Sequence, residues 1–122
     1  MIQNNAILVT EDGRKFKHGT IVRHFKGKYY KVLAVNVIHT ETLEPMVVYQ
    51  ALYDDNKIFA RPQEMFISEV DHNKYPMEKT KFRLTPVTNI LNQIGMKDFL
   101  KLLHEDEKAH NSRFDVMNNL VR

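Results

Sequence analysis

RHFKGKYYKVLAVNVIHTETLEPMVVYQALYDDNKIFARPQEMF, residues 23–66, is the stretch that decides the fold. Three runs in it are rich in the residues that suit a pleated sheet: Tyr29–His39, Met46–Tyr53 and Lys57–Ala60. Polar turns separate these runs, the second turn through Asp54 and the two residues after it. Pro62 ends the third run and suits the first position of a single helical turn. The stretch predicts consecutive antiparallel strands followed by a one-turn helix.

The flanking sequence adds short strands on both sides of this stretch. Asp12-Gly13 is a hairpin-turn signal between two short runs, and Lys26-Gly27-Lys28 reads as a second tight turn. The additional strands that we expect are Ala6–Thr10, Thr20–Phe25, a closing strand Phe66–Val70 and an edge strand Thr80–Leu84. This order of short antiparallel strands predicts a mainly β fold, an SH3-like small antiparallel barrel.

From Pro86 onward the apolar period changes from that of a strand to that of a helix. Thr88 suits the N-cap of a short first helix, and Gly95 suits its C-cap. A second helix is predicted over Met96–Ala109, with an apolar face of Phe99, Leu100 and Leu103. A third helix follows a cap at Asn111-Ser112, with apolar residues at Phe114, Met117 and Val121.

We therefore expect a barrel domain over residues 1–86 and a helical C-terminal extension over residues 87–122. Helices this short are marginal in water unless they are packed against something. Two alternatives follow for the extension. It packs on the barrel of its own chain, or it binds a partner helix or a second copy and makes an oligomer.

The composition excludes several classes of protein. The chain has 122 residues and no cysteine, which excludes disulfides, thiolate nucleophiles and Cys-based metal sites and fits a reducing compartment. The N-terminal residues do not have the pattern of a signal peptide, and no apolar run is long enough to span a membrane. These features predict a cytoplasmic protein with no membrane partner.

Residues 23–66 also carry a series of short motifs in order. They are His24-Phe25-Lys26-Gly27, Tyr30 with Val32-Leu33, His39 with Glu41-Thr42, Val47-Val48-Tyr49, Ala51-Leu52-Tyr53, and Arg61-Pro62 with Glu64-Met65-Phe66. Together they resemble the small bacterial family catalogued as domain of unknown function 1653, over about residues 19–84. The chain departs from that family at Asp54, where the family tends to have Gly, and at Phe59, where it tends to have Trp.

The resemblance implies an SH3-like barrel and brings no assigned activity. The motif residues are expected to hold the barrel together rather than to act on a ligand. We expect this structural motif to consist of His24, Gly27, Tyr30, Tyr49, Tyr53, Arg61, Pro62 and Glu64.

The strongest candidate for function is a basic run. Residues 14–31 carry seven Lys and Arg residues and no acid, and Phe and Tyr residues are interleaved with them. Cations neutralise phosphates and aromatic rings stack on bases, so this pattern suits RNA or DNA, or else an acidic protein. The alternative is a solvated basic face that binds nothing. The candidate binding residues are Arg14, Lys15, Lys17, Arg23, Lys26, Lys28 and Lys31, extended by Lys79, Lys81 and Arg83.

Arg61, Glu64 and the turn acids Glu41 and Glu44 allow two interpretations. They form an acid/base pair, or Arg61 pairs with a carboxylate and holds the one-turn helix against the barrel. We favour the structural interpretation, because no nucleophile elbow or phosphate-binding loop accompanies these residues. We expect no enzyme activity and no cofactor.

Two histidine groups have weak metal-ligand patterns. His24, His39 and Glu41 would converge only if the strands brought them together, and Glu107-Lys108-Ala109-His110 is one copy of a spacing that metal bundles use twice. A histidine at a strand end more commonly forms a turn hydrogen bond. We therefore expect no metal site.

Overall fold

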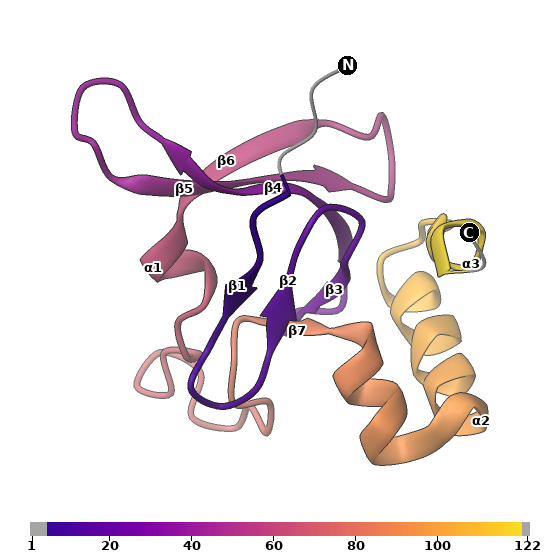
Figure 1. The fold of residues 1–122 in the computed structure, drawn as a ribbon. Helices are drawn as coiled ribbons and strands as arrows, with labels where there is room; N and C mark the ends of the chain where they lie inside the picture. The colour runs from indigo at the N-terminus through magenta and orange to yellow at the C-terminus, as the bar shows by residue number, and fades with distance from the viewer. Residues whose placement is uncertain (1–4, 121–122) are drawn as a thin grey trace.

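The computed structural model describes residues 5–120. Figure 1 shows a curled sheet with a short hairpin on one side and the C-terminal helices on the other. The elements in chain order are β1 (Leu8–Val9), β2 (Lys15–Phe16), β3 (Ile21–His24), β4 (Tyr29–Ile38), β5 (Pro45–Ala51), β6 (Ile58–Pro62), α1 (Gln63–Phe66), β7 (Leu84–Pro86), α2 (Val87–Ala109) and α3 (Val116–Leu120).

The main sheet has five antiparallel strands in the order β6-β5-β4-β3-β7, and β1 and β2 form a separate two-stranded sheet. Register shifts on either side of Ala34 interrupt the pairing of β4 with β5, and such irregularities bend and twist a strand. The mainly β fold with a helical C-terminal extension is therefore confirmed. The predicted closed barrel is wrong, because β6 and β7 remain as the two edges of an open sheet in the described part of the chain. The SH3-like topology stays a prediction.

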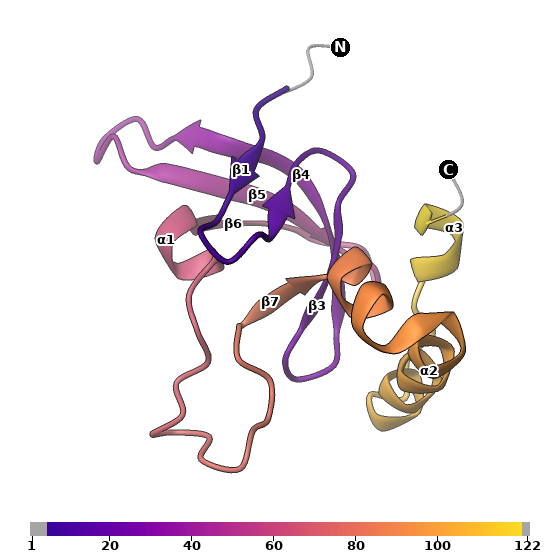
Figure 2. The ribbon, with the colours of Figure 1, turned by 60° about the horizontal axis from the view of Figure 1, so that its bottom comes forward.

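Each face of the sheet contributes to a different hydrophobic core. Successive residues of a strand point to opposite faces, so Val22 belongs to one core and Ile21 to the other. Figure 2 shows α1 and the β1–β2 hairpin on the side of the sheet away from α2 and α3. The first core, which includes side chains of that hairpin and of α1, consists of Phe16, Val22, Val32, Val35, Val47, Tyr49, Phe66 and Leu84.

The second core lies between the sheet and the C-terminal helices. Phe99 and Leu103 of α2 pack there with Phe114, which precedes α3. Of the two alternatives for the extension, the structure shows its packing on its own chain. Leu100 and Met117 of the predicted apolar faces are 42% and 40% exposed, and Val121 lies outside the described residues. The sheet contributes Ile21, Tyr29 and neighbouring Leu52 to this core, and α2 and α3 also contribute Val87 and Val116.

Two of the predicted strands are wrong. Residues 66–70 and 80–83 form no regular strand. They meet only at an isolated bridge between Glu69 and Phe82, and Phe66 is the last residue of α1. The edge strand β7 begins at Leu84 and pairs with the end of β3 at His24.

The helical boundaries follow the glycine and proline signals closely. A break at Gly95, with φ 80° and ψ 168°, divides α2 as predicted. The helix begins at Val87 after Pro86, so Thr88 is not its cap, and α3 begins only at Val116. None of the helices among residues 5–120 has the length and apolar character needed to cross a membrane.

Candidate anion-binding surface

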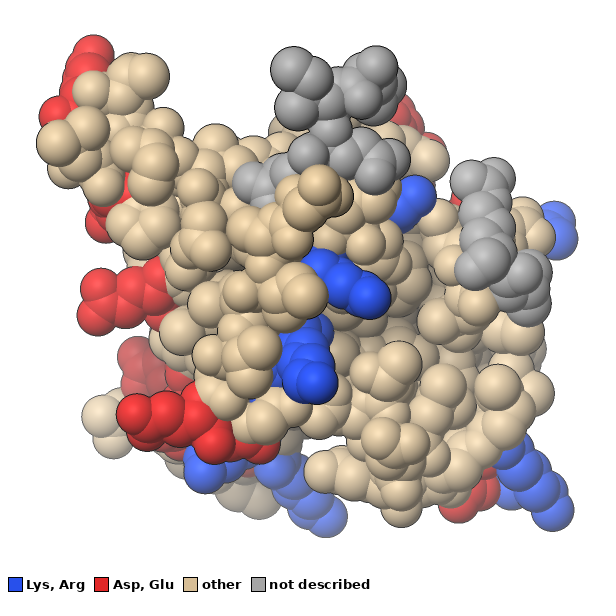
Figure 3. All heavy atoms as spheres, in the orientation of Figure 1, with Lys and Arg blue, Asp and Glu red and all other residues tan. Residues whose placement is uncertain are grey.

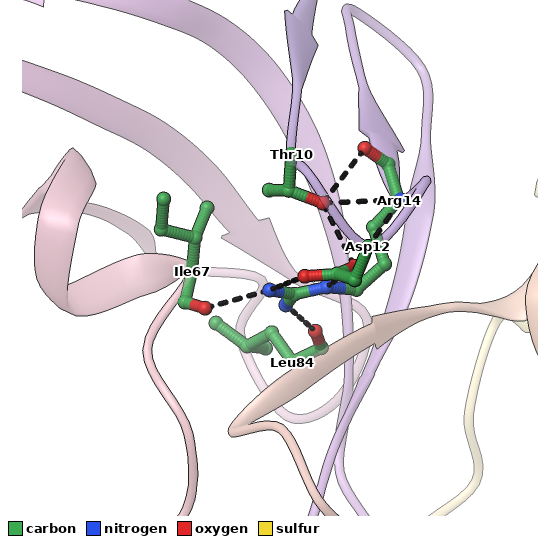
Figure 4. A network of polar contacts seen from close by, with 5 residues as sticks. All are labelled: Thr10, Asp12, Arg14, Ile67 and Leu84. Atoms are coloured by element: carbon green, nitrogen blue, oxygen red, sulfur yellow. Dashed lines mark hydrogen bonds and ion pairs between the residues drawn. The ribbon is translucent and has the colours of Figure 1, made fainter.

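Arg14 is buried, so the prediction that it lies on a basic surface is wrong. The residue is 3% exposed, and its side chain donates to both carboxylate oxygens of Asp12, with Nε 2.8 Å from Oδ1 (Figure 4). It also donates to the carbonyl oxygens of Ile67 and Leu84 at 2.7 and 3.1 Å. These bonds from Arg14 hold the pKa of Asp12 at about 2. Arg14 therefore fastens the β1–β2 hairpin to the chain after α1 and to β7.

Arg23 is also paired. It binds the carboxylate of Asp106 on α2 in a bidentate manner, through Nε at 2.8 Å and Nη2 at 3.0 Å. The hydroxyl of Tyr29 donates to the same carboxylate at 2.7 Å, and burial raises the pKa of Tyr29. Asp106 is 7% exposed, so this cluster joins α2 to β3 and β4 in the protein interior.

Gly27 lies directly against this cluster. Its φ of 95° is in the left-handed region, and a Cβ at this position would stand 2.7 Å from Asp106 Oδ1. His110 Nε2 lies 2.7 Å from the carbonyl oxygen of Lys26 in the same turn. The end of α2 therefore holds the β3–β4 turn in place, and only a glycine fits against it.

The remaining cations of residues 14–31 do not form one continuous patch. Lys15 and Lys17 are exposed beside His18 in a cleft of about 590 Å³. Lys31 pairs with Ile21 and therefore lies on the face that the helices cover. On the side of the molecule shown in Figure 3, two blue side chains lie next to each other near the centre, and the other blue side chains lie apart from them.

Two of the downstream cations line a different cleft. Lys79 and Lys81 lie beside Phe82 and the first part of α2, around a cleft of about 480 Å³ that also includes Arg23. The structure therefore distributes the predicted basic residues over several places instead of extending a single stripe.

One group of cations does gather, around a cluster of aromatic rings. Tyr30 is the centre of this cluster, with ring centroids 5.3 Å from Tyr49 and 5.6 Å from Tyr53. Phe59 of β6 pairs with Tyr49 of β5, and their centroids are 5.8 Å apart. The hydroxyls of Tyr30 and Tyr53 share a 2.8 Å hydrogen bond. Phe59 is 40% exposed, so one ring of the cluster faces solvent.

Lys28 and Arg61 stand beside this cluster. Lys28 Nζ lies 4.6 Å from the centroid of Tyr53, within the range of a cation–π contact. Arg61 follows Phe59 two residues later on β6, which places both side chains on the same face of the sheet. The positive charge of Arg61 acts on Tyr49 and on His24.

Arg61 and Arg83 are half-buried cations without a carboxylate partner. Within residues 5–120, neither guanidinium has an acidic oxygen within 4.0 Å. The predicted ion pair that would hold α1 through Arg61 is therefore wrong, and Glu64 is exposed. Arg83 is near enough to His24 and Tyr49 for its charge to act on both.

His24 lies among these cations. Burial, followed by the positive charges of Arg61, Lys26 and Arg83, lowers the pKa of His24 to about 4. Its Nδ1 accepts a 3.1 Å hydrogen bond from the backbone N–H of Lys26, so the neutral ring carries its proton on Nε2. At neutral pH His24 is therefore an uncharged donor. We call this assembly the aromatic–cationic surface: His24, Lys26, Lys28, Tyr30, Tyr53, Phe59, Arg61 and Arg83, with the buried ring of Tyr49 beneath them.

The histidines considered as metal ligands are engaged in hydrogen bonds. His39 Nδ1 accepts from the backbone N–H groups of Glu41 and Thr42 at 3.2 and 3.3 Å, which is the turn role expected for it. On α2, Glu107 accepts from the backbone N–H of Phe114 at 2.9 Å. In the part of the chain that the structure describes, no three His, Asp or Glu residues gather into a group that would hold a metal ion.

The structural motif expected from the resemblance coincides with much of this surface. His24, Tyr30, Tyr49, Tyr53 and Arg61 were expected to be frame, and the structure places them together at the aromatic–cationic surface. Phe59 was noted only as a departure from Trp. The parity of Phe59 with Arg61 on one strand was the signal that would have added it to the candidate site.

Comparison with known proteins identifies one family. Residues 20–84, more than half of the chain, match the model of a family described as "Protein of unknown function (DUF1653)". The matched segment runs from the residue before β3 to the first residue of β7 and includes the whole aromatic–cationic surface. No curated protein and no solved structure matches the chain.

Proposed function

The chain belongs to the DUF1653 family, and we propose that it is a non-catalytic module that binds single-stranded nucleic acid through the aromatic–cationic surface. One observation carries the proposal. Arg61 and Arg83 have no carboxylate partner in the described chain, and an exposed aromatic ring, Phe59, stands two residues from Arg61.

Cations that lack an internal partner are the groups that gain most from a phosphate. Each neutralised phosphate releases counterions, which gives single-strand binding a salt dependence of about −0.7 in log K per log salt. The cations offered by this surface are Lys26, Lys28, Arg61 and Arg83. A strand contacting all four would bind with a slope of about −3.

Aromatic rings supply the second contact that a single strand requires. Stacking of a base on an exposed ring contributes about 1–3 kcal/mol. Phe59 is the most exposed ring of the cluster, and its inner side packs against the rings of Tyr30 and Tyr49. Unpaired bases fit such a surface, whereas bases inside a duplex do not present their faces.

Fluorescence anisotropy with a labelled mixed-sequence RNA and its DNA equivalent, at several salt concentrations, tests the proposal. We expect binding that weakens steeply with salt. The double variant Lys28→Gln/Arg61→Gln should lower the salt slope by about 1.4, the contribution of two phosphate contacts. Phe59→Ala should weaken binding at every salt concentration with an unchanged slope.

Lys15→Gln/Lys17→Gln is the matched control, because it removes the same net charge from a different cleft. We expect it to change the affinity far less than the Lys28 and Arg61 pair. Equal losses from the two double variants would show that only net charge matters and would contradict the proposed surface. Absence of binding at low salt would remove nucleic acid as the ligand and favour an acidic protein partner.

A further inference from the structure

We infer that the cleft between α2 and the residues leading into β7 binds a small amphipathic anion, with an aliphatic chain inside the cleft and a carboxylate at its rim. We call it the α2–β7 cleft, and its main lining residues are Lys79, Lys81, Phe82, Ile90, Ile94 and Leu102. The inference goes beyond the proposed function, because the cleft is a separate site for a different kind of ligand.

The α2–β7 cleft opens on the face of the sheet opposite to the aromatic cluster around Tyr30. Arg23 of β3 and Thr85 of β7 pair with each other, and both line the cleft. Arg23 also pairs with Tyr29, which belongs to the second core, whereas Tyr30 packs against the first core. Successive residues of a strand point to opposite faces, so a ligand in the cleft does not contact the Tyr30 cluster.

The break in α2 gives the cleft its shape. The helix begins directly after β7, and its second part turns back after Gly95 (Figure 1). Ile90 and Ile94 come from the first part of the helix, and Leu102 comes from the second part. The space among these elements is about 480 Å³, which lies within the range of about 300–1,000 Å³ for small-molecule sites.

Two of the lining side chains are fixed before any ligand arrives. Arg23 is held by its bidentate contact with Asp106, at 2.8 and 3.0 Å. The guanidinium of Arg14 lies 3.6 Å from the ring centroid of Phe82 and holds that ring in place. A ligand therefore loses little affinity to the ordering of these walls.

The walls favour an aliphatic body over a nucleobase. Ile90, Ile94 and Leu102 are aliphatic, and they line the cleft together with Phe82. Arg14 already covers one face of the Phe82 ring. A base would therefore have at most one face of one ring to stack on, whereas an aliphatic chain gains from contact with all four side chains.

The rim of the cleft favours a negative head group. Lys79 and Lys81 are exposed, and within residues 5–120 neither Nζ has a carboxylate oxygen within 4.0 Å. Among the described residues that line the cleft, none is Asp or Glu. The neighbouring Glu78 accepts from the backbone N–H of Thr80 at 3.0 Å. The side chains of Thr80 and Gln93 add hydrogen-bonding groups, so a carboxylate finds both opposite charge and donors there.

Methyl NMR of the full chain, titrated with octanoate, tests the inference. The comparison probes are 1-octanol, which has the same chain without the charge, and acetate, which has the charge without the chain, all at equal ionic strength. We expect octanoate to cause saturable shifts at the methyl groups of Ile90, Ile94 and Leu102. The methyl groups of Leu100, which is exposed on α2 outside the cleft, are the internal control.

The probes should differ in affinity by defined amounts. We expect 1-octanol to bind about tenfold more weakly than octanoate, or weaker still, and acetate to cause no shift at these methyl groups. Hexanoate should bind about fifteenfold more weakly than octanoate, because each buried methylene contributes about fourfold.

Variants separate the contribution of the rim from that of the walls. Lys79→Gln/Lys81→Gln should weaken octanoate by about tenfold and remove its advantage over 1-octanol. Lys97→Gln/Lys101→Gln is the matched control, because it removes the same charge from exposed positions of α2 outside the cleft, and it should leave the affinity unchanged. Ile94→Trp should fill the cleft and abolish binding, and the fold should tolerate it because Ile94 is 40% exposed.

Several results would overturn the inference. Equal affinities for octanoate and 1-octanol would remove the role of the charged head, and equal shifts at Leu100 would mean that the probe binds without a defined site. Tighter binding of adenosine monophosphate than of octanoate would overturn the aliphatic assignment. Phe59→Ala should leave octanoate binding unchanged, because its pairing with Tyr49 places Phe59 on the opposite face of the sheet.

Discussion

Two regions of this molecule use the same side chain in opposite ways. Arg14 and Arg23 are buried or nearly so, and each binds a carboxylate through two nitrogens. Arg61 and Arg83 are half-buried, and no carboxylate within residues 5–120 lies within 4.0 Å of either. The first pair fastens elements together, whereas the second pair remains able to bind an external anion.

The difference is one of partners and not of residue type. A buried guanidinium is strongly destabilising unless a carboxylate and further hydrogen bonds accompany it. Asp12 and Asp106 meet that requirement for Arg14 and Arg23. The position of acidic residues therefore decides which arginines serve the fold, and a count of basic residues along the chain does not.

Removal of Asp106 should have the largest effect on the fastened region. Asp106→Ala leaves the guanidinium of Arg23 without its counter-charge in the interior, which should lower the free energy of unfolding by about 3–5 kcal/mol. Urea unfolding measures this loss. Glu105→Ala, at an exposed position of the same helix, is the control and should change stability little. A loss below about 1 kcal/mol for Asp106→Ala would mean that the pair does not hold α2 to the sheet.

Arg14→Met should have the next largest effect. The apolar replacement leaves the carbonyl oxygens of Ile67 and Leu84 without their donor, at a cost of about 1–3 kcal/mol for a buried group. Chemical denaturation again gives the difference, with the neighbouring exposed Lys15→Met as control. Equal stability of the two variants would contradict the role of Arg14 as a fastener.

Gly27→Ala separates backbone strain from steric contact. Gly13 and Gly27 have similar φ values, 90° and 95°, but an added Cβ would have neighbours within 4 Å only at Gly27, the nearest being Asp106 Oδ1. Gly13→Ala should cost about 1 kcal/mol from strain, and Gly27→Ala should cost more. The difference in thermal unfolding between the two variants measures the contact with Asp106. Identical losses of stability in the two variants would show that the Asp106 side chain moves away from the added Cβ without a measurable cost.

His24→Gln should have the smallest effect, visible only in the dependence of stability on pH. The pKa of His24 falls from 6.5 to about 4 on folding, so the unfolded chain binds more protons between these values. Stability therefore decreases as the pH falls from 6.5 toward 4. The variant should flatten this decrease by a fraction of one proton, as urea unfolding at pH 7, 5.5 and 4.5 would show. An unchanged slope would mean that neither burial nor the nearby positive charges lower the pKa of His24 in the folded chain.

The local parts of the fold were predictable from sequence. Tight turns and breaks are set by neighbouring residues, and the positive φ of Gly27 and the helix break at Gly95 follow from their types. The runs that suit strands gave β4, β5 and β6 with only small differences at their ends. The closed barrel was not predictable, because closure depends on the curl of a whole sheet and on the pairing of its edges.

The candidate site was likewise predictable only where neighbouring residues in the sequence determine it. The interleaving of cations and aromatic residues predicted Lys26 and Lys28 as binding residues, and the alternation of Thr80–Leu84 added Arg83. No local pattern announces that Arg14 is buried, because its partner carbonyls lie 53 and 70 residues away. The burial of Asp106 was not predictable either, because it lies in a charged helical segment, where an aspartate is ordinarily solvated.

The Arg23–Asp106 contact also has a consequence for the order in which the chain acquires its structure. The two residues are 83 positions apart, so during synthesis Arg23 is made roughly 4–17 s before Asp106. Through that interval Ile21 and Tyr29 face water, because α2 does not yet cover them. The second core therefore stays open on the face of the sheet until the helical extension has been translated.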